Sequence, residues 1–157
     1  MSAAEVFDYR DEFYLKTFRR WYVIKLLCSN KKFVAGVPLQ KAGFVDFLIC
    51  NPLILRKFLM HFDKAAPSLN LDDLLYKDNI DSDGGQDITD FSRTCTLLIS
   101  QGHIKFMRQE GEIFLVSNDV DFSVASELAN RWKKEIDLIQ PLLGKSLAVL
   151  STGILRG

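Results

Sequence analysis

The spacing of hydrophobic residues predicts three helices in the first 62 residues. Residues 11–30 are apolar on two neighbouring stripes, which is typical of a helix at the centre of a domain. Residues 39–51 form a second amphipathic segment, which should end before Asn51 because the following Pro52 disfavours helix at that position. The same pair predicts the start of a third helix over 52–62, with Asn51 as its cap and Pro52 at its first position.

The next regular elements are a helix and a β-hairpin. Phe91, Cys95 and Leu98 lie on one stripe of a helix that ends just before Gly102, within residues 87–102. Strands at 103–107 and 112–116 follow, joined by a short turn. Ile104 and Phe106 alternate with His103, Lys105 and Met107, so we expect them on the buried face of the hairpin.

A last amphipathic helix is predicted over residues 123–140, ended by Pro141 and Gly144. Two segments fall outside this pattern. Residues 63–87 have no sustained period and predict a long acidic surface loop. Residues 142–157 form an apolar C-terminal tail, which we expect to pack on the body of the domain or on a partner.

The order of these elements predicts a single domain over residues 1–157. Its fold class is mainly α with a small β-hairpin, and the sequence of helices followed by a hairpin and a closing helix is typical of an elaborated winged-helix domain. The hydrophobic share of 48% is ample for a core. No apolar run is long enough to span a membrane and no signal peptide is recognisable, so we expect a cytoplasmic protein.

Charge is uneven although the net charge is zero. Residues 1–62 carry ten Lys and Arg against five Asp and Glu, and residues 63–102 carry three against eight. This distribution excludes a uniformly basic nucleic-acid binder and leaves a local basic patch open. The candidate nucleic-acid contacts are Lys16, Arg19, Arg20, Lys31, Lys32, Lys105 and Arg108.

The sequence contains no motif for catalysis, nucleotide binding or a metal. It has no phosphate-binding glycine loop, and its two histidines are not near a Cys or an acidic pair. The three cysteines are far apart in apolar runs, which indicates buried thiols. The aspartates of residues 78–87 do not fit a calcium loop in any frame. We therefore expect no enzyme activity and no cofactor.

The helix before the hairpin argues against sequence-specific DNA binding. A recognition helix is expected to be rich in basic or amide side chains that reach base edges. This helix offers Arg93 and Gln101 but carries Asp87 and Asp90 at its N-terminal end, where they would repel phosphates. Phosphate contacts through the first helix or the hairpin tip remain open.

With these elements in place, residues 12–140 resemble the small middle component of the ABC-three-component systems, including the small subunit of Lamassu-type antiphage defence. The resemblance lies in the order of an aromatic-rich first helix, the segment "VDFLICNPLIL", and the segment "FSRTCTLLISQGHIKFMRQEGEIFLVS". The loop at 63–87 departs from the family's commoner glycine-proline pattern. The matching positions are Asp46, Phe47, Leu48, Asn51, Pro52, Leu97, Leu98, Gly102, His103 and Ile104.

The resemblance implies a non-catalytic adaptor subunit of a bacterial defence complex. Such a subunit would bridge a coiled-coil ABC ATPase, related to the SMC-like chromosome-maintenance ATPases, and an effector of the nuclease type, and DNA would be touched mainly by the complex. The alternative is a small dimeric winged-helix DNA-binding transcription regulator. Under the adaptor hypothesis, the candidate partner-interface residues are Met107, Phe114, Leu147, Val149, Leu150, Ile154 and Leu155.

Overall fold

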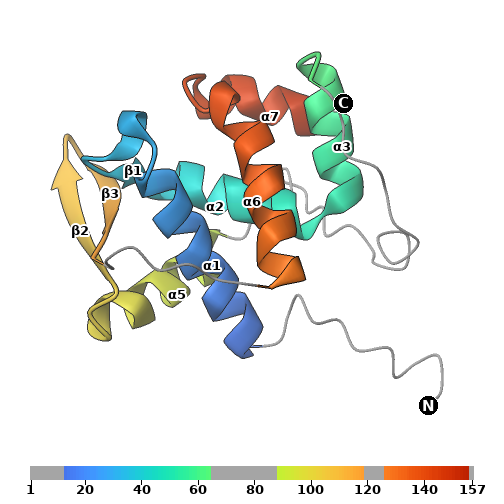
Figure 1. The fold of residues 1–157 in the computed structure, drawn as a ribbon. Helices are drawn as coiled ribbons and strands as arrows, with labels where there is room; N and C mark the ends of the chain where they lie inside the picture. Colours follow the sequence, from blue (N-terminus) through green and yellow to red (C-terminus); the bar gives the residue numbers. More distant parts are fainter. Residues whose placement is uncertain (1–12, 65–87, 119–125, 156–157) are drawn as a thin grey trace.

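The computed structural model describes residues 13–64, 88–118 and 126–155 (Figure 1). These residues form a mainly helical fold with a small antiparallel sheet of three strands. The acidic loop predicted over 63–87 lies almost entirely outside the described residues. No helix in the described part of the chain is long and apolar enough to cross a membrane.

Helix α1 (Phe13–Cys28) occupies the centre of the domain, as its two apolar stripes predict. It packs against α2 (Leu39–Cys50), α5 (Ile88–Ser100), α6 (Glu127–Ile139) and the sheet. Val23, Ile24 and Leu27 are completely buried in these contacts. Burying a side chain of this size stabilises a fold by roughly 1.5–3 kcal/mol, so α1 contributes much of the core.

Helix α2 ends and α3 (Pro52–His61) begins at Asn51, as predicted. The cap itself differs from the prediction, because the Asn51 side chain does not cap α3. Its Nδ2 donates to the carbonyl of Phe47 at 2.8 Å, while its backbone carbonyl accepts from the amide of Leu55 at 2.9 Å. Asn51 thus satisfies the end of one helix with its side chain and the start of the next with its backbone.

The connection from α5 to the hairpin is a tight C-terminal cap at Gly102, which has a φ of +81°. The amide of Gly102 donates to Ile99 and the amide of His103 donates to Leu98, the bond pattern of a Schellman motif. Strand β2 (Ile104–Gln109) starts one residue later and pairs with β3 (Glu112–Ser117). The prediction of a helix, a glycine stop and a hairpin is confirmed.

A third strand was not predicted. After the short 3-10 helix η3 (Lys31–Phe33), β1 (Val37–Pro38) pairs with Leu115 and Phe114 of β3, so the sheet has the order β1-β3-β2. A segment of two residues has no measurable hydrophobic period. Its pairing partner is also more than 70 residues away, so local sequence carries no signal for it.

The sheet face that packs on the helices is defined by Val37, Ile104 and Leu115, which are all buried. The prediction that Phe106 is buried with them is wrong. Phe106 lies opposite Leu115 and on the same face, but half of its side chain is exposed (50%). Strand β2 therefore extends beyond the helices that cover β1 and β3.

The segment predicted as an apolar tail is folded. Helix α6 leads through the 3-10 helix η4 (Gln140–Leu142) into α7 (Leu147–Leu155), which packs mainly on α3. Gly153 lies against Phe58, and a Cβ at this position would come within 2.7 Å of the Phe58 ring. The sequence left open whether this segment packs on the body of the domain or on another protein, and α7 packs on the body of the domain (Figure 1).

The hairpin turn provides a test of the sheet. Its two central residues, Glu110 and Gly111, both have positive φ (54° and 80°), as a type I′ turn requires. Glutamate is poorly suited to this conformation, so we expect Glu110→Asn to raise the free energy of unfolding by about 0.5–1 kcal/mol. Glu110→Ala keeps the same strain and should leave stability nearly unchanged. Urea unfolding of the three proteins would measure this, and equal stability of all three would contradict the turn geometry.

Candidate interaction surface

Two arginines predicted to contact nucleic acid are buried in the interior. Arg19 and Arg20 are neighbours on α1, and both donate to the buried carboxylate of Asp46 on α2. The Nε–oxygen distances are 2.7 Å from Arg19 and 3.1 Å from Arg20. A single carboxylate therefore accepts from two guanidinium groups between α1 and α2.

Arg20 also links α1 to α5. Its Nη1 lies 2.8 Å from an Asp90 carboxylate oxygen and 2.8 Å from the hydroxyl of Thr94, and its guanidinium lies over the ring of Phe91. The same Asp90 oxygen accepts from Lys16 at 3.2 Å. Burial alone would raise the pKa of Asp90, but the hydrogen bonds and charges of Arg20 and Lys16 outweigh it and lower that pKa.

This ion network corrects the predicted set of nucleic-acid contacts. Arg19 and Arg20 are 3% and 8% exposed, and reaching a phosphate would break bonds that hold three helices together. Lys16 is partly buried and paired with Asp90. The spacing of these cations along α1 resembled a basic surface stripe, but their partners lie on other helices and only the fold brings them close.

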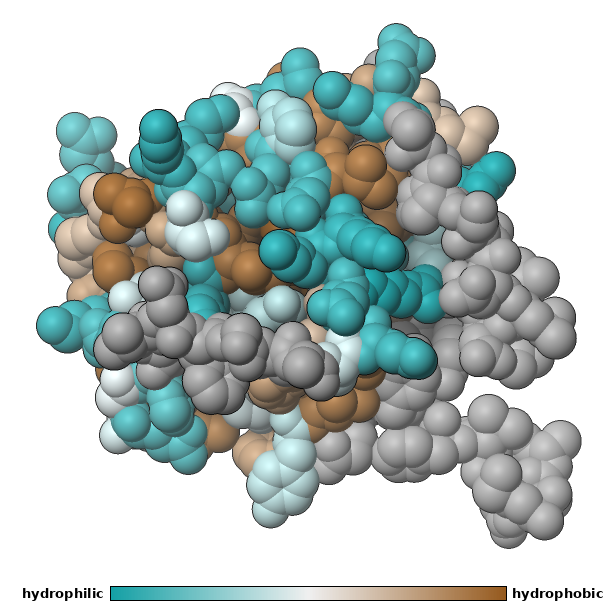
Figure 2. Space-filling model, viewed as in Figure 1, coloured by the Kyte–Doolittle hydropathy of each residue, from teal (hydrophilic) through white to brown (hydrophobic). Residues whose placement is uncertain are grey.

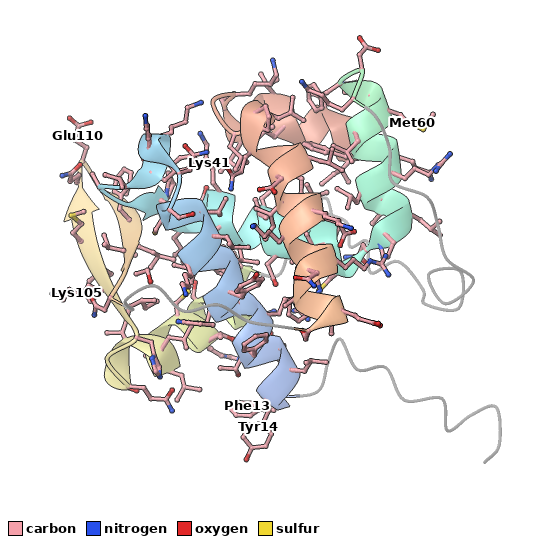
Figure 3. All side chains as sticks on the ribbon, viewed as in Figure 1. Phe13, Tyr14, Lys41, Met60, Lys105 and Glu110 are labelled. Carbon is pink, nitrogen blue, oxygen red and sulfur yellow. The ribbon has the colours of Figure 1, made fainter. Side chains whose placement is uncertain are left out.

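The other four predicted cations are on the surface. Lys31 and Lys32 lie on η3, and Lys105 and Arg108 lie on β2, all of them exposed. In the described part of the chain, no acidic side chain forms an ion pair with Lys105 or Arg108. Figure 3 shows Lys105 directed away from the helices.

Of the two predicted interface residues on the hairpin, Met107 is exposed and Phe114 is half-buried. They are paired across β2 and β3 on the outer face of the sheet. Gly36 covers part of this face, because a Cβ at its position would lie 3.1 Å from the Cβ of Phe114 and 3.3 Å from Met107. Gly36 has a φ of +141°, so glycine is required there for both space and backbone conformation.

The predicted interface residues of the C-terminal segment separate into two groups. Val149 is exposed on α7, whereas Leu150 is completely buried and is therefore a core residue, not a surface contact. Leu147 and Ile154 are partly buried against the core. The side chain of Leu155 lies outside the described residues.

Phe106 is the candidate contact that sequence analysis missed. Together with Lys105, Met107 and Arg108 it forms four consecutive exposed residues, which we call the hairpin surface. Phe106 and Met107 emerge on opposite faces of β2, so both faces of this strand are accessible (Figure 2 shows hydrophobic atoms on this flank of the molecule). Alternation located the two faces correctly but could not show that no helix covers Phe106.

No other chemistry stands out in the part of the chain that the structure describes. It contains no group of His, Cys, Asp and Glu that would hold a metal ion. The three cysteines are free thiols, and burial raises the pKa of Cys95 to about 12, which keeps it protonated and unreactive at neutral pH. The chain matches no family model, and it has no match among curated proteins or solved structures.

The network predicts a large effect of removing its shared acceptor. Asp46→Ala would leave two buried guanidinium groups without their carboxylate, so we expect it to lower the free energy of unfolding by about 3–5 kcal/mol. Asp137→Ala, which removes an exposed carboxylate from α6, should change stability by less than about 0.5 kcal/mol. Urea unfolding measures both, and a loss below about 1 kcal/mol for Asp46→Ala would contradict the network's role.

Asp90 predicts a pH dependence of stability. Because its pKa is lower in the folded than in the unfolded chain, its contribution is present above the unfolded value and is lost as pH falls through the folded value. We expect the stability difference between the wild type and Asp90→Asn to shrink between about pH 5 and pH 2. An exposed control, Asp137→Asn, should run parallel to the wild type. Parallel curves for Asp90→Asn as well would refute the predicted shift.

Proposed function

We propose that this chain is a non-catalytic adaptor subunit that binds other proteins through a winged-helix domain. Among the described residues, the order of α1, β1, α2, α3, α5, β2 and β3, with the sheet order β1-β3-β2, matches that of a winged helix into which α3 is inserted. In this interpretation β2 and β3 form the wing, and α5 occupies the position of a recognition helix.

One observation carries the proposal: two of the cations predicted to touch nucleic acid are buried, while the wing exposes apolar side chains. Arg19 and Arg20 hold the core, and Phe106 and Met107 are exposed (50% and 36%). Exposed aromatic and methionine side chains are enriched where proteins bind proteins. A phosphate backbone is instead bound by cationic side chains.

Helix α5 supports the same conclusion. Its exposed positions are Thr89, Arg93, Thr96 and Ser100, so only one of them is charged. The hydroxyls of Thr96 and Ser100 donate to carbonyls of their own helix, those of Ser92 and Leu97. A face with one cation and internally bonded hydroxyls offers little for base edges or phosphates.

The resemblance to the ABC-three-component systems supplies the partners of this proposal. The adaptor would join a coiled-coil, SMC-like ABC ATPase to an effector component of a Lamassu-type antiviral defence complex. The partners would then carry out any catalysis, and DNA would be bound mainly by the complex. The uneven charge along the chain would help fix the orientation of the assembly.

The test is affinity purification of the tagged chain at native level, with co-purifying proteins identified by mass spectrometry before and after nuclease treatment. We expect nuclease-resistant recovery of a coiled-coil ATPase. A double variant, Phe106→Asp with Met107→Asp, should lose this partner because it places charge in the apolar interface. Met60→Asp, at another exposed apolar position, on α3, is the control and should retain it. Recovery of the chain alone, or only with nuclease-sensitive DNA, would reject the adaptor.

The alternative, a dimeric DNA-binding regulator, is favoured by one observation. Lys31, Lys32, Lys105 and Arg108 are all exposed, and phosphate contacts need nothing more specific than accessible cations. This alternative requires that the isolated chain bind duplex DNA with a steep salt dependence. Replacing Lys105 and Arg108 with alanine should then reduce the slope of log affinity against log salt by about 2.

A further inference from the structure

Within the part of the chain that the structure describes, strand β2 is an open edge of the sheet. The order β1-β3-β2 gives it a single neighbour, and it forms the outer edge of the sheet in Figure 1. Its pairing with β3 is continuous from Ile104 to Gln109, with no bulge and no proline. A regular edge of this length is a template for one more strand unless something blocks it.

The backbone groups on this edge can be assigned from the ladder. The amide of Asn118 donates to the carbonyl of His103 at 3.0 Å, which makes these residues a hydrogen-bonded pair. Hydrogen-bonded and non-bonded pairs alternate along an antiparallel ladder. The backbone N–H and C=O groups of Phe106 and Arg108 therefore point away from β3, toward the open edge.

Side chains flank this edge in a regular pattern. Lys105 and Met107 lie on one face of β2, and Phe106 and Arg108 lie on the other. Read along the strand, two cations enclose two apolar side chains, and all four are exposed. A strand added beside β2 would place its own side chains within reach of each of these residues.

Charge determines which strand fits. The residues of β2 include two cations and no acidic residue. A second copy paired antiparallel about Phe106 would set Lys105 opposite Met107 and Arg108 opposite Ile104, so neither cation would gain an acidic partner. The same cations would attract carboxylates. The edge thus offers its own copy no opposite charge and is complementary to an acidic strand.

We infer that β2 binds an extended acidic segment of a partner protein, which adds to the sheet as a fourth strand. The matching segment has the pattern acidic, apolar, apolar, acidic, with the carboxylates opposite Lys105 and Arg108. The pattern is symmetric, so it fits in either strand direction. This inference rests on the proposal that the chain binds proteins through its hairpin, and it names the chemistry of the partner.

The experiment uses the full chain and a short fluorescent peptide with glutamate, valine, isoleucine and glutamate at its centre. We expect saturable binding that weakens with salt, and none with a peptide in which lysines replace the glutamates. In amide hydrogen exchange by NMR, the amides of Phe106 and Arg108 should exchange rapidly in the free protein and slowly with the peptide bound.

Two sets of variants separate backbone pairing from side-chain contact. Phe106→Pro removes the outward N–H and keeps the ladder to β3, so it should weaken peptide binding by more than about tenfold. Phe106→Ala keeps the N–H and should lose less affinity. Lys105→Glu combined with Arg108→Glu should reverse the preference, so that the lysine peptide binds about tenfold more tightly than the glutamate peptide.

Each outcome decides the inference. No binding at peptide concentrations on the order of 1 mM, unchanged affinity in Phe106→Pro, or an unreversed preference in the charge variant would overturn it. If the co-purified ATPase is retained by Phe106→Pro and by the charge variant, the edge-strand inference fails and the adaptor stands. If the peptide binds as expected and no protein partner co-purifies, the adaptor fails and the edge-strand site stands.

Discussion

The fold depends on two adjacent arginines that point into the protein. Arg19 and Arg20 reach from the central helix to Asp46 on α2 and Asp90 on α5, and the buried charges of Arg19, Arg20 and Asp46 are stable in the interior only because they are paired. The network holds α5 against α1. Because α5 passes into β2 through the single cap at Gly102, it also determines where the hairpin leaves the helical body. The arginines that the sequence predicts as nucleic-acid contacts therefore act inside the protein, where they position the exposed hairpin.

Five helices and the hairpin could be predicted because their signals are local. Apolar spacing, the Asn51–Pro52 pair and Gly102 each act over a few residues, and they set most element boundaries to within about two residues. The start of α6 was predicted four residues too early, and α7 was not predicted as a helix. Partners distant in sequence could not be predicted in this way. Arg19 is 27 residues from Asp46, and Val37 pairs with Leu115 across about half of the chain. A short strand and a buried arginine are both defined by such partners.

The candidate site could be predicted only where its signals are local. Strand alternation and charge located Lys105, Met107 and Arg108 correctly on the surface, because exposed charges at an edge strand need no partner to be recognised. Phe106 was predicted in the core but is exposed, and Leu150 was predicted at an interface but is buried in the core. Both are large apolar residues in apolar surroundings. Only the position of a neighbouring helix determines that Phe106 is open to solvent and Leu150 is covered.

The packing of α7 on α3 has a consequence for how the chain acquires its fold on the ribosome. Residues 52–61 are synthesised early and can pack on α2, where Phe58 meets Phe44, but the contact between Phe58 and Gly153 forms only after residues 147–155 are made. Until then the nascent chain carries an apolar face of α3 that α7 does not yet cover, the kind of surface that chaperones bind. Helix α7 therefore covers an apolar face of α3 that was synthesised much earlier.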